Sequence, residues 1–126
     1  MNNTKIVQWI LRIAVAGEFI GHGALALQGN PKWFKYFQAV GITGDENIAT
    51  LLLLVGIADI ALAIMVLIKP IRPLVLWMAA WGLWTALIRW PIGPDDPVWD
   101  FVERWANWGA PLALFFLLGR NKDKEE

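Results

Sequence analysis

The chain has 126 residues, of which 57% are hydrophobic, and its 11 basic residues balance its 11 acidic ones. This composition is typical of an integral membrane protein and argues against a basic surface that would recruit nucleic acid. The sequence contains no cysteine, which excludes dithiol chemistry, disulfide bonds and thiolate-ligated metals.

Four apolar segments predict an all-α fold: an integral membrane four-helix transmembrane bundle that forms one domain over residues 1–126. The segments run from about 5 to 28, 48 to 68, 74 to 90 and 101 to 118. A helix needs roughly 20 residues to cross a bilayer, so the first two segments are long enough. The last two are short and need interfacial residues to complete them. No small-residue cleavage site follows a short apolar core, so we expect no removable signal peptide.

The first segment carries two ionisable side chains, Glu18 and His22, four residues apart. On a helix this spacing places them on one face. Ionisable groups in an apolar span normally face a bundle interior or a wet cavity, which predicts the wall of a polar pocket. Gly17 and Gly21 have the same spacing on a neighbouring strip, and we expect them to form a packing seam within the subunit.

The connections between segments add two predictions. Residues 32–42 mix aromatic and basic side chains, which favours a short amphipathic helix lying in the membrane interface. Residues 91–97 form an acidic, proline-rich loop that contains Asp95 and Asp96. We interpret this loop as a solvated turn that caps the fourth helix rather than as a cation site.

The distribution of basic residues predicts the orientation. With the N-terminus inside, the cytoplasmic side holds Lys5, Lys69, Arg72, Arg120, Lys122 and Lys124. The outer loops hold fewer basic residues and several acidic ones, so the positive-inside rule favours cytoplasmic termini. We therefore expect a multi-pass protein of the bacterial or archaeal cytoplasmic (inner) membrane with both termini in the cytoplasm.

The charged side chains of the four segments are expected at a similar depth in the membrane. Counting about 1.5 Å of helical rise per residue from the end of each segment places one group of them in the outer half of the bundle. The group consists of Glu18, His22, Asp59, Arg89, Glu103 and Arg104. Asn107 shares a helical face with Glu103. Such a set can line a polar pocket, or it can neutralise itself as a buried structural network.

Trp77, Trp81 and Trp84 form a stripe at helical spacing in the third segment. The stripe can stack on a flat ring such as a quinone, or it can contact lipid and fill the core. The single histidine excludes a bis-histidine haem. We expect no metal site, because one imidazole with two carboxylates has no further imidazole or thiolate to complete the set.

The first segment resembles the first helix of the DoxX/DoxD-like family of small four-helix membrane proteins through Arg12, Gly17, Phe19, His22 and Gly23. The second segment is similar to that family's second helix through Gly56 and Asp59, with Asp in place of the more usual Glu. The last segment is similar through Glu103 and residues 107–112. The chain departs from the family pattern at one place. Family members often have a lysine shortly after the histidine-glycine pair, whereas this chain has Ala24-Leu25-Ala26 there.

The resemblance implies a membrane subunit associated with redox chemistry. DoxD-type members are membrane subunits of a thiosulfate:quinone oxidoreductase, and other relatives are linked to thiol and oxidative-stress complexes. Because this chain has no cysteine, a partner protein would supply any sulfur chemistry.

The first functional hypothesis is a redox-associated subunit that binds a quinone or a small anionic substrate, with no covalently bound cofactor. Arg89 and Arg104 hold the ligand oxygens, and His22 with Glu18 relays a proton. Asp59 orients or neutralises the arginines. The binding site as a whole is expected to comprise Asp59, Trp81, Arg89, Glu103, Arg104 and Asn107.

Two alternatives remain open at the level of sequence. One is a non-catalytic membrane scaffold or anchor whose buried charges hold the helices together. The other is a small transporter or proton path, which four spans can enclose only as an oligomer. The expected partners are the lipid bilayer, a partner oxidoreductase subunit and further copies of the same chain.

Overall fold

The computed structural model describes residues 2–92 and 97–125, and all regular secondary structure among them is helical. The all-α prediction is therefore confirmed for these residues, whereas Asp95 and Asp96 lie outside them. The elements in chain order are α1 (Asn3–Leu27), η1 (Pro31–Trp33), α2 (Phe34–Ala39), α3 (Asp45–Ile68), α4 (Arg72–Leu87), α5 (Arg89–Ile92), α6 (Pro97–Val102) and α7 (Trp105–Glu125).

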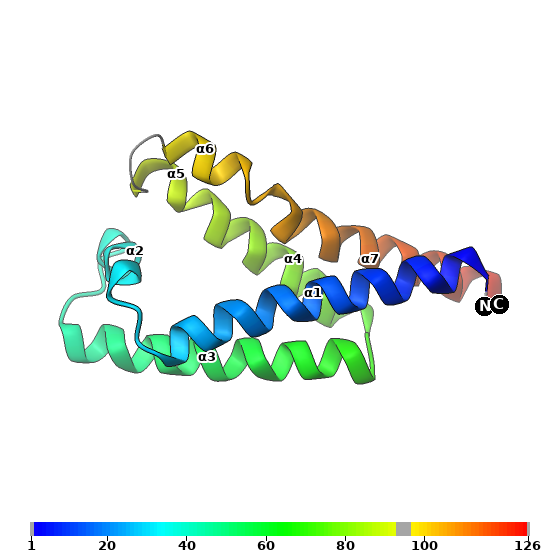
Figure 1. Cartoon of the computed structure of the whole chain (residues 1–126), viewed down its shortest axis with the longest axis horizontal. Helices are drawn as coiled ribbons and strands as arrows, with labels where there is room; N and C mark the ends of the chain where they lie inside the picture. The colour runs from blue at the N-terminus through cyan, green and yellow to red at the C-terminus, as the bar shows by residue number, and fades with distance from the viewer. Residues whose placement is uncertain (1, 93–96, 126) are drawn as a thin grey trace.

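The long helices form two pairs that converge at the end of the molecule holding both chain termini (Figure 1). Helix α1 packs along α3, and α4 packs along α7. The pairs diverge toward the opposite end, where α2 lies between them and α5 and α6 cap the second pair (Figure 1). This divergence leaves the space in which the candidate site lies.

Two of the helices, α1 and α3, are long and apolar enough to cross a membrane, with 25 and 24 residues. Only 33% and 28% of their most apolar stretches are buried inside the molecule. The central helix of a soluble protein would bury most of such a stretch. Large apolar side chains such as Ile10 and Ile13 on α1, and Leu54 and Ile57 on α3, are instead more than half exposed.

The third and fourth predicted segments have different boundaries in the structure. The third becomes α4, which ends at Leu87, and the separate short helix α5. Because α4 has 16 residues, it is about 24 Å long, shorter than the roughly 30 Å of a bilayer core. The fourth is divided at Glu103 and Arg104, between α6 and α7. Among the described residues, two helices are both long and apolar enough to cross a membrane, and a bundle of four such helices is not confirmed.

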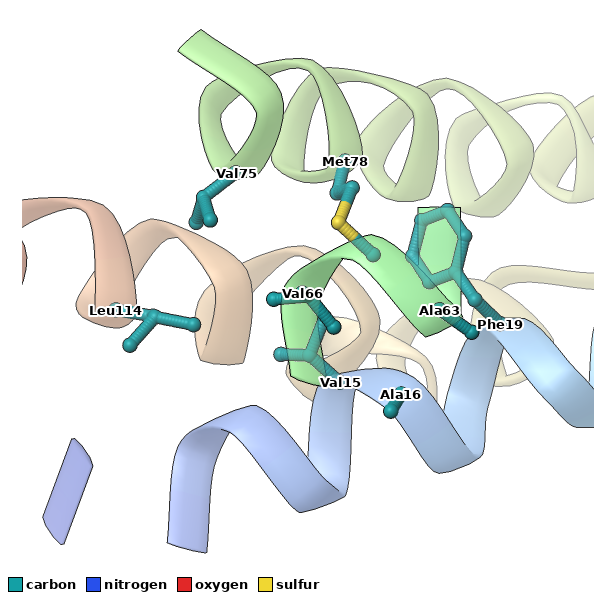
Figure 2. Close-up of a cluster of buried hydrophobic side chains, with 8 residues drawn as sticks. All are labelled: Val15, Ala16, Phe19, Ala63, Val66, Val75, Met78 and Leu114. Carbon is teal, nitrogen blue, oxygen red and sulfur yellow. The ribbon is translucent and has the colours of Figure 1, made fainter. Parts of the chain in front are cut away.

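The main hydrophobic core lies at the converging end and draws on all the long helices (Figure 2). Val15, Val66, Val75, Met78 and Leu114 are completely buried there, and Phe19 is 3% exposed. A smaller cluster at the other end joins the last turns of α1 to the start of α3. It consists of Ala26, Ile48 and Leu52, covered by aromatic side chains of η1 and α2.

Arg12 is buried at the converging end, where it binds the C-terminal turn of α3. Its Nε donates a hydrogen bond to the Val66 carbonyl at 3.0 Å, and its Nη2 donates to the Leu67 carbonyl. The last carbonyls of a helix have no intrahelical partner, so the guanidinium satisfies two of them and places positive charge at the negative end of the helix. The central carbon of the Arg12 guanidinium, Cζ, also lies 3.7 Å from the centre of a Trp9 ring.

Glycines mark the closest approaches between helices, although not where the sequence predicted them. A Cβ on Gly23 would lie 3.1 Å from the Gly56 carbonyl oxygen, and a Cβ on Gly82 would clash with the Asn107 carbonyl oxygen. By contrast, Gly17 and Gly21 are exposed, and nothing lies within 4 Å of a Cβ built on either. The prediction that Gly17 and Gly21 form an internal packing seam is therefore wrong.

Candidate functional site

A cavity of about 240 Å³ opens between the diverging helix pairs, bounded by α1, the η1–α2 segment, α3, α4 and α5. Most of its lining is apolar or aromatic. Its polar side chains include the imidazole of His22, the carboxyl of Asp59 and the guanidinium of Arg89. Concave, mostly apolar sites with a few convergent polar groups are the usual form of a small-molecule site.

The η1–α2 segment covers one side of this cavity with Trp33, Tyr36 and Phe37. The segment lies between Gly29 and Gly41, whose φ angles of 68° and 90° suit glycine rather than residues with side chains. The Asn30 side chain accepts a hydrogen bond from the Lys32 amide and caps the first turn. These turns fold the aromatic segment over the end of α1 and the start of α3. The short helix that the sequence predicted here is present as α2, whereas its place in a membrane interface stays a prediction.

His22 and Asp59 lie where the main cavity meets a smaller one. The smaller cavity, of about 10 Å³, is also lined by Glu18 and Thr85. The His22 ring lies against the Trp33 ring, with 5.9 Å between centroids and a tilt of 38°. Asp59 is only 4% exposed, yet it forms no ion pair with any arginine in the described part of the chain.

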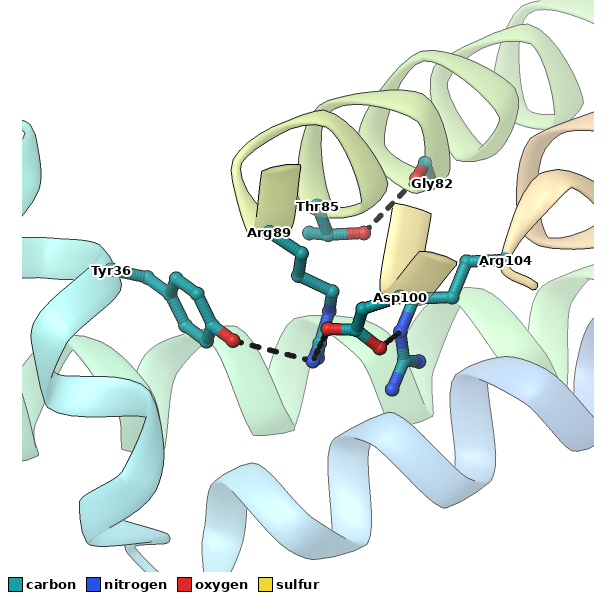
Figure 3. Close-up of polar contacts among 6 residues, drawn as sticks. All are labelled: Tyr36, Gly82, Thr85, Arg89, Asp100 and Arg104. Carbon is teal, nitrogen blue, oxygen red and sulfur yellow. Dashed lines mark hydrogen bonds and ion pairs between the residues drawn. The ribbon is translucent and has the colours of Figure 1, made fainter. Parts of the chain in front are cut away.

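The arginines meet a carboxylate that the sequence argument did not select as a site residue. Arg104 donates from Nε to the Asp100 carboxylate at 3.2 Å, within one helical turn. An Arg89 Nη nitrogen lies 3.6 Å from the other Asp100 oxygen and donates to the Tyr36 hydroxyl at 3.4 Å. Figure 3 shows the Arg89 guanidinium between the Tyr36 ring and Asp100, with Arg104 on the far side of the carboxylate.

Asp100 is the electrostatic centre of this group. Burial by itself would raise the pKa of its carboxyl group, but the positive charges of Arg104 and Arg89 outweigh that effect. Together with the hydrogen bond from Arg104, they hold the Asp100 pKa below its ordinary value. Asp100 therefore stays ionised and links α5 to the α6–α7 junction.

The structure places the predicted site residues in three groups. His22, Asp59, Trp81 and Arg89 line the main cavity, and Glu18 lines the smaller cavity beside it. Arg104 is connected to Arg89 only through Asp100. Neither Glu103, which is exposed, nor Asn107, whose carbonyl packs against Gly82, borders either cavity.

Sequence reasoning overlooked Tyr36, Trp33 and Asp100 as site residues. The four-residue spacing of Asp100 and Arg104 is a recognisable helical ion-pair signal, and both residues were expected in the first two turns of the fourth segment, but the pair was not selected. The aromatic content of the segment before α3 was visible. Its position over His22 depends on the backbone turn at Gly29, which sequence patterns do not specify.

No protein-family model, curated protein or solved structure matches this chain. The resemblance to the DoxX/DoxD-like family therefore stays a prediction. Among residues 2–92 and 97–125, no three His, Cys, Asp or Glu side chains cluster in a way that would hold a metal ion.

Proposed function

We propose that the protein is a multi-pass protein of the bacterial or archaeal cytoplasmic membrane that binds a quinone-type ring compound, as a redox-associated subunit of DoxX/DoxD-like type. One observation carries this proposal. The cavity between the helix pairs combines stacking surfaces, Trp33, Tyr36 and Trp81, with the polar groups of His22 and Arg89. The exposed apolar faces of α1 and α3 support a membrane location.

The size and chemistry of the cavity suit the head group of such a ligand. Its volume of about 240 Å³ is slightly below the roughly 300–1,000 Å³ typical of sites for drug-sized molecules, so a compact ring system fits better than a larger molecule. Aromatic side chains favour offset stacking on a flat ring. The Arg89 guanidinium is incompletely paired, because its Nε is buried and has no hydrogen-bond partner.

A bound quinone would supply the capacity to accept two electrons and two protons, with the electrons delivered by a partner subunit. In this proposal Arg89 holds a ring oxygen through charge-assisted hydrogen bonds. His22, beside Glu18 in the adjoining cavity, moves protons between that cavity and the ligand. Asp59 lines both cavities, and its proposed role is to orient the imidazole ring of His22. The role of Arg104 is indirect, because it holds Asp100 and thereby positions Arg89.

The proposal is tested by titrating menadione into the purified protein in lipid nanodiscs and following tryptophan fluorescence. We expect saturable quenching above the linear quenching that membrane-dissolved menadione causes. Trp81→Leu should weaken the saturable binding, whereas Trp99→Leu should not, since Trp99 is 66% exposed and lies outside the cavity. Strictly linear quenching in the wild-type protein, equal to that of both variants, would exclude a quinone site.

A non-catalytic scaffold is the second candidate, and the arginines at the converging end favour it. Arg12 binds carbonyls of α3, and Arg72 donates from Nε to the Phe115 carbonyl of α7 at 3.3 Å. Both side chains therefore connect helices rather than face a cavity. A scaffold predicts that neutralising Arg89 or Asp59 lowers the melting temperature while no quinone raises it, whereas a ligand site predicts a stabilising shift.

A further inference from the structure

Arg89 is the most unusual side chain of the cavity, because it is buried without being well paired. Its exposed fraction is 9%, and it begins α5, immediately after the break that ends α4. Its contacts to the Tyr36 hydroxyl (3.4 Å) and the Asp100 carboxylate (3.6 Å) are both long. Its Nε is buried with no partner. A buried guanidinium with an unused donor costs free energy unless something completes its hydrogen bonds.

The neighbouring carboxylates do not supply the missing partner. The shorter contact of Asp100 goes to Arg104, at 3.2 Å, and the hydroxyl of Tyr36 is an uncharged acceptor. Asp59, the carboxyl group of the cavity, forms no ion pair with Arg89. Glu103 is exposed to solvent, interacts with Asp100, and does not line the cavity. Arg89 therefore lines the cavity as a cation, and its carboxylate partner, Asp100, is shared with a second cation, Arg104.

We propose that the natural ligand is a planar ring compound that carries an ionised oxygen, such as an acidic hydroxyquinone or an aromatic carboxylate, and that the Arg89 guanidinium binds this oxygen. This inference rests on the proposed function and narrows its ligand class. The aromatic side chains of the lining stack on the ring, and the incompletely paired guanidinium of Arg89 favours an anionic ligand over a neutral one. The guanidinium can donate to a neutral carbonyl as well, but an anion adds the attraction between two full charges, so it gains more at this buried position.

The test compares two probes that share one ring: lawsone, a hydroxynaphthoquinone that is anionic at neutral pH, and its neutral methyl ether. Binding to the protein in nanodiscs is measured by equilibrium dialysis, with empty nanodiscs as the blank. We expect lawsone to bind about tenfold more tightly than the ether or better, because only the anion adds an attraction between two full charges to its hydrogen bond with Arg89. Arg89→Gln should reduce this ratio to near one while retaining binding of the ether.

Lys32→Gln is the matched control, because Lys32 is an exposed cation outside the cavity lining. It should leave the ratio unchanged, which separates binding by Arg89 from general attraction of anions to a positive surface. A second measurement needs no variant: phenylglyoxal modification of Arg89, mapped by mass spectrometry in the wild-type protein. Lawsone should protect Arg89 from modification, and the ether should protect it less.

The outcomes separate the two proposals. Equal binding of both probes by the wild-type protein, or a preference that survives Arg89→Gln, would overturn the inference and leave the quinone-type site standing. Absence of Arg89 protection by lawsone, while lawsone binds, would overturn it as well. If neither probe binds, the proposed function fails together with the inference. A preference for lawsone that depends on Arg89 and not on Lys32 would support both.

Discussion

Gly23 and Gly56 face each other where α1 crosses α3, and each leaves no room for a side chain on the other. A Cβ on Gly23 would lie 3.1 Å from the Gly56 carbonyl oxygen, and a Cβ on Gly56 would lie 3.0 Å from the Gly23 carbonyl oxygen. Small residues allow helices to approach this closely in membranes. The contact sets the position of α3 relative to α1, and these two helices carry Asp59 and His22, which line the same cavities.

The first prediction follows from this contact. Gly56→Ala should lower the free energy of unfolding by about 1–3 kcal/mol, the usual cost of overpacking, because the added methyl group meets backbone and the branched part of Leu27. The measurement is unfolding by sodium dodecyl sulfate in mixed micelles, followed by circular dichroism. Gly17→Ala is the control, since its methyl group meets nothing within 4 Å. Equal stability of the two variants would contradict the close crossing.

The second prediction concerns Arg12, which binds the end of α3 through the carbonyls of Val66 and Leu67. Arg12→Gln should destabilise the fold by about 1.5–3 kcal/mol, as expected for losing hydrogen bonds to a charged donor. Lys5→Gln, an exposed cation on the same helix, should change stability little. The same unfolding measurement applies. An Arg12→Gln protein as stable as wild type would show that the hydrogen bonds from Arg12 to the end of α3 contribute nothing to stability.

The third prediction uses the depressed pKa of Asp100. The folded state holds this carboxyl group ionised, so the unfolded state binds more protons once the pH approaches the ordinary Asp value of about 3.9. Stability supplied by Asp100 is therefore fully present above that value and is lost as the pH falls through it toward the folded-state pKa. Melting temperatures of the wild type and of Asp100→Asn should converge below about pH 4.

The difference between these two proteins isolates Asp100 from the other carboxyl groups. At neutral pH the wild-type protein should melt at the higher temperature, because Asp100→Asn leaves Arg89 and Arg104 without their shared carboxylate. A constant gap between the two proteins over the whole pH range would show that Asp100 does not titrate with a lowered pKa.

The strongest sequence signals were the long apolar runs, and these gave α1 and α3 correctly. The region from Arg89 to Arg104 was harder to predict, because its prolines and charges interrupt the apolar pattern. The apolar run predicts a continuous helix from residue 101, which would align Glu103 with Asn107. The backbone instead turns at Glu103 and Arg104. The backbone N–H of Asn107 donates a hydrogen bond to the carbonyl of Arg104, three residues before it. That turn removes the expected alignment of Glu103 with Asn107.

The candidate site was predictable in part for a related reason. His22, Asp59 and Trp81 lie inside regular helices, where depth along the helix is a reliable guide, and they do line one cavity. Tyr36 depends on how a loop folds back, and the preference of Arg89 for Asp100 over Asp59 depends on the angle between helix pairs. Local sequence patterns contain neither quantity.

The most direct test of a ring-binding cavity is photolabelling of the protein in lipid nanodiscs with an azidoquinone, followed by mass-spectrometric mapping of the labelled residues. We predict labels on cavity-lining residues, above all Trp33, Tyr36 and Trp81, that excess menadione removes. Labels confined to exposed positions such as Trp99 and Phe116, and unaffected by menadione, would contradict the account.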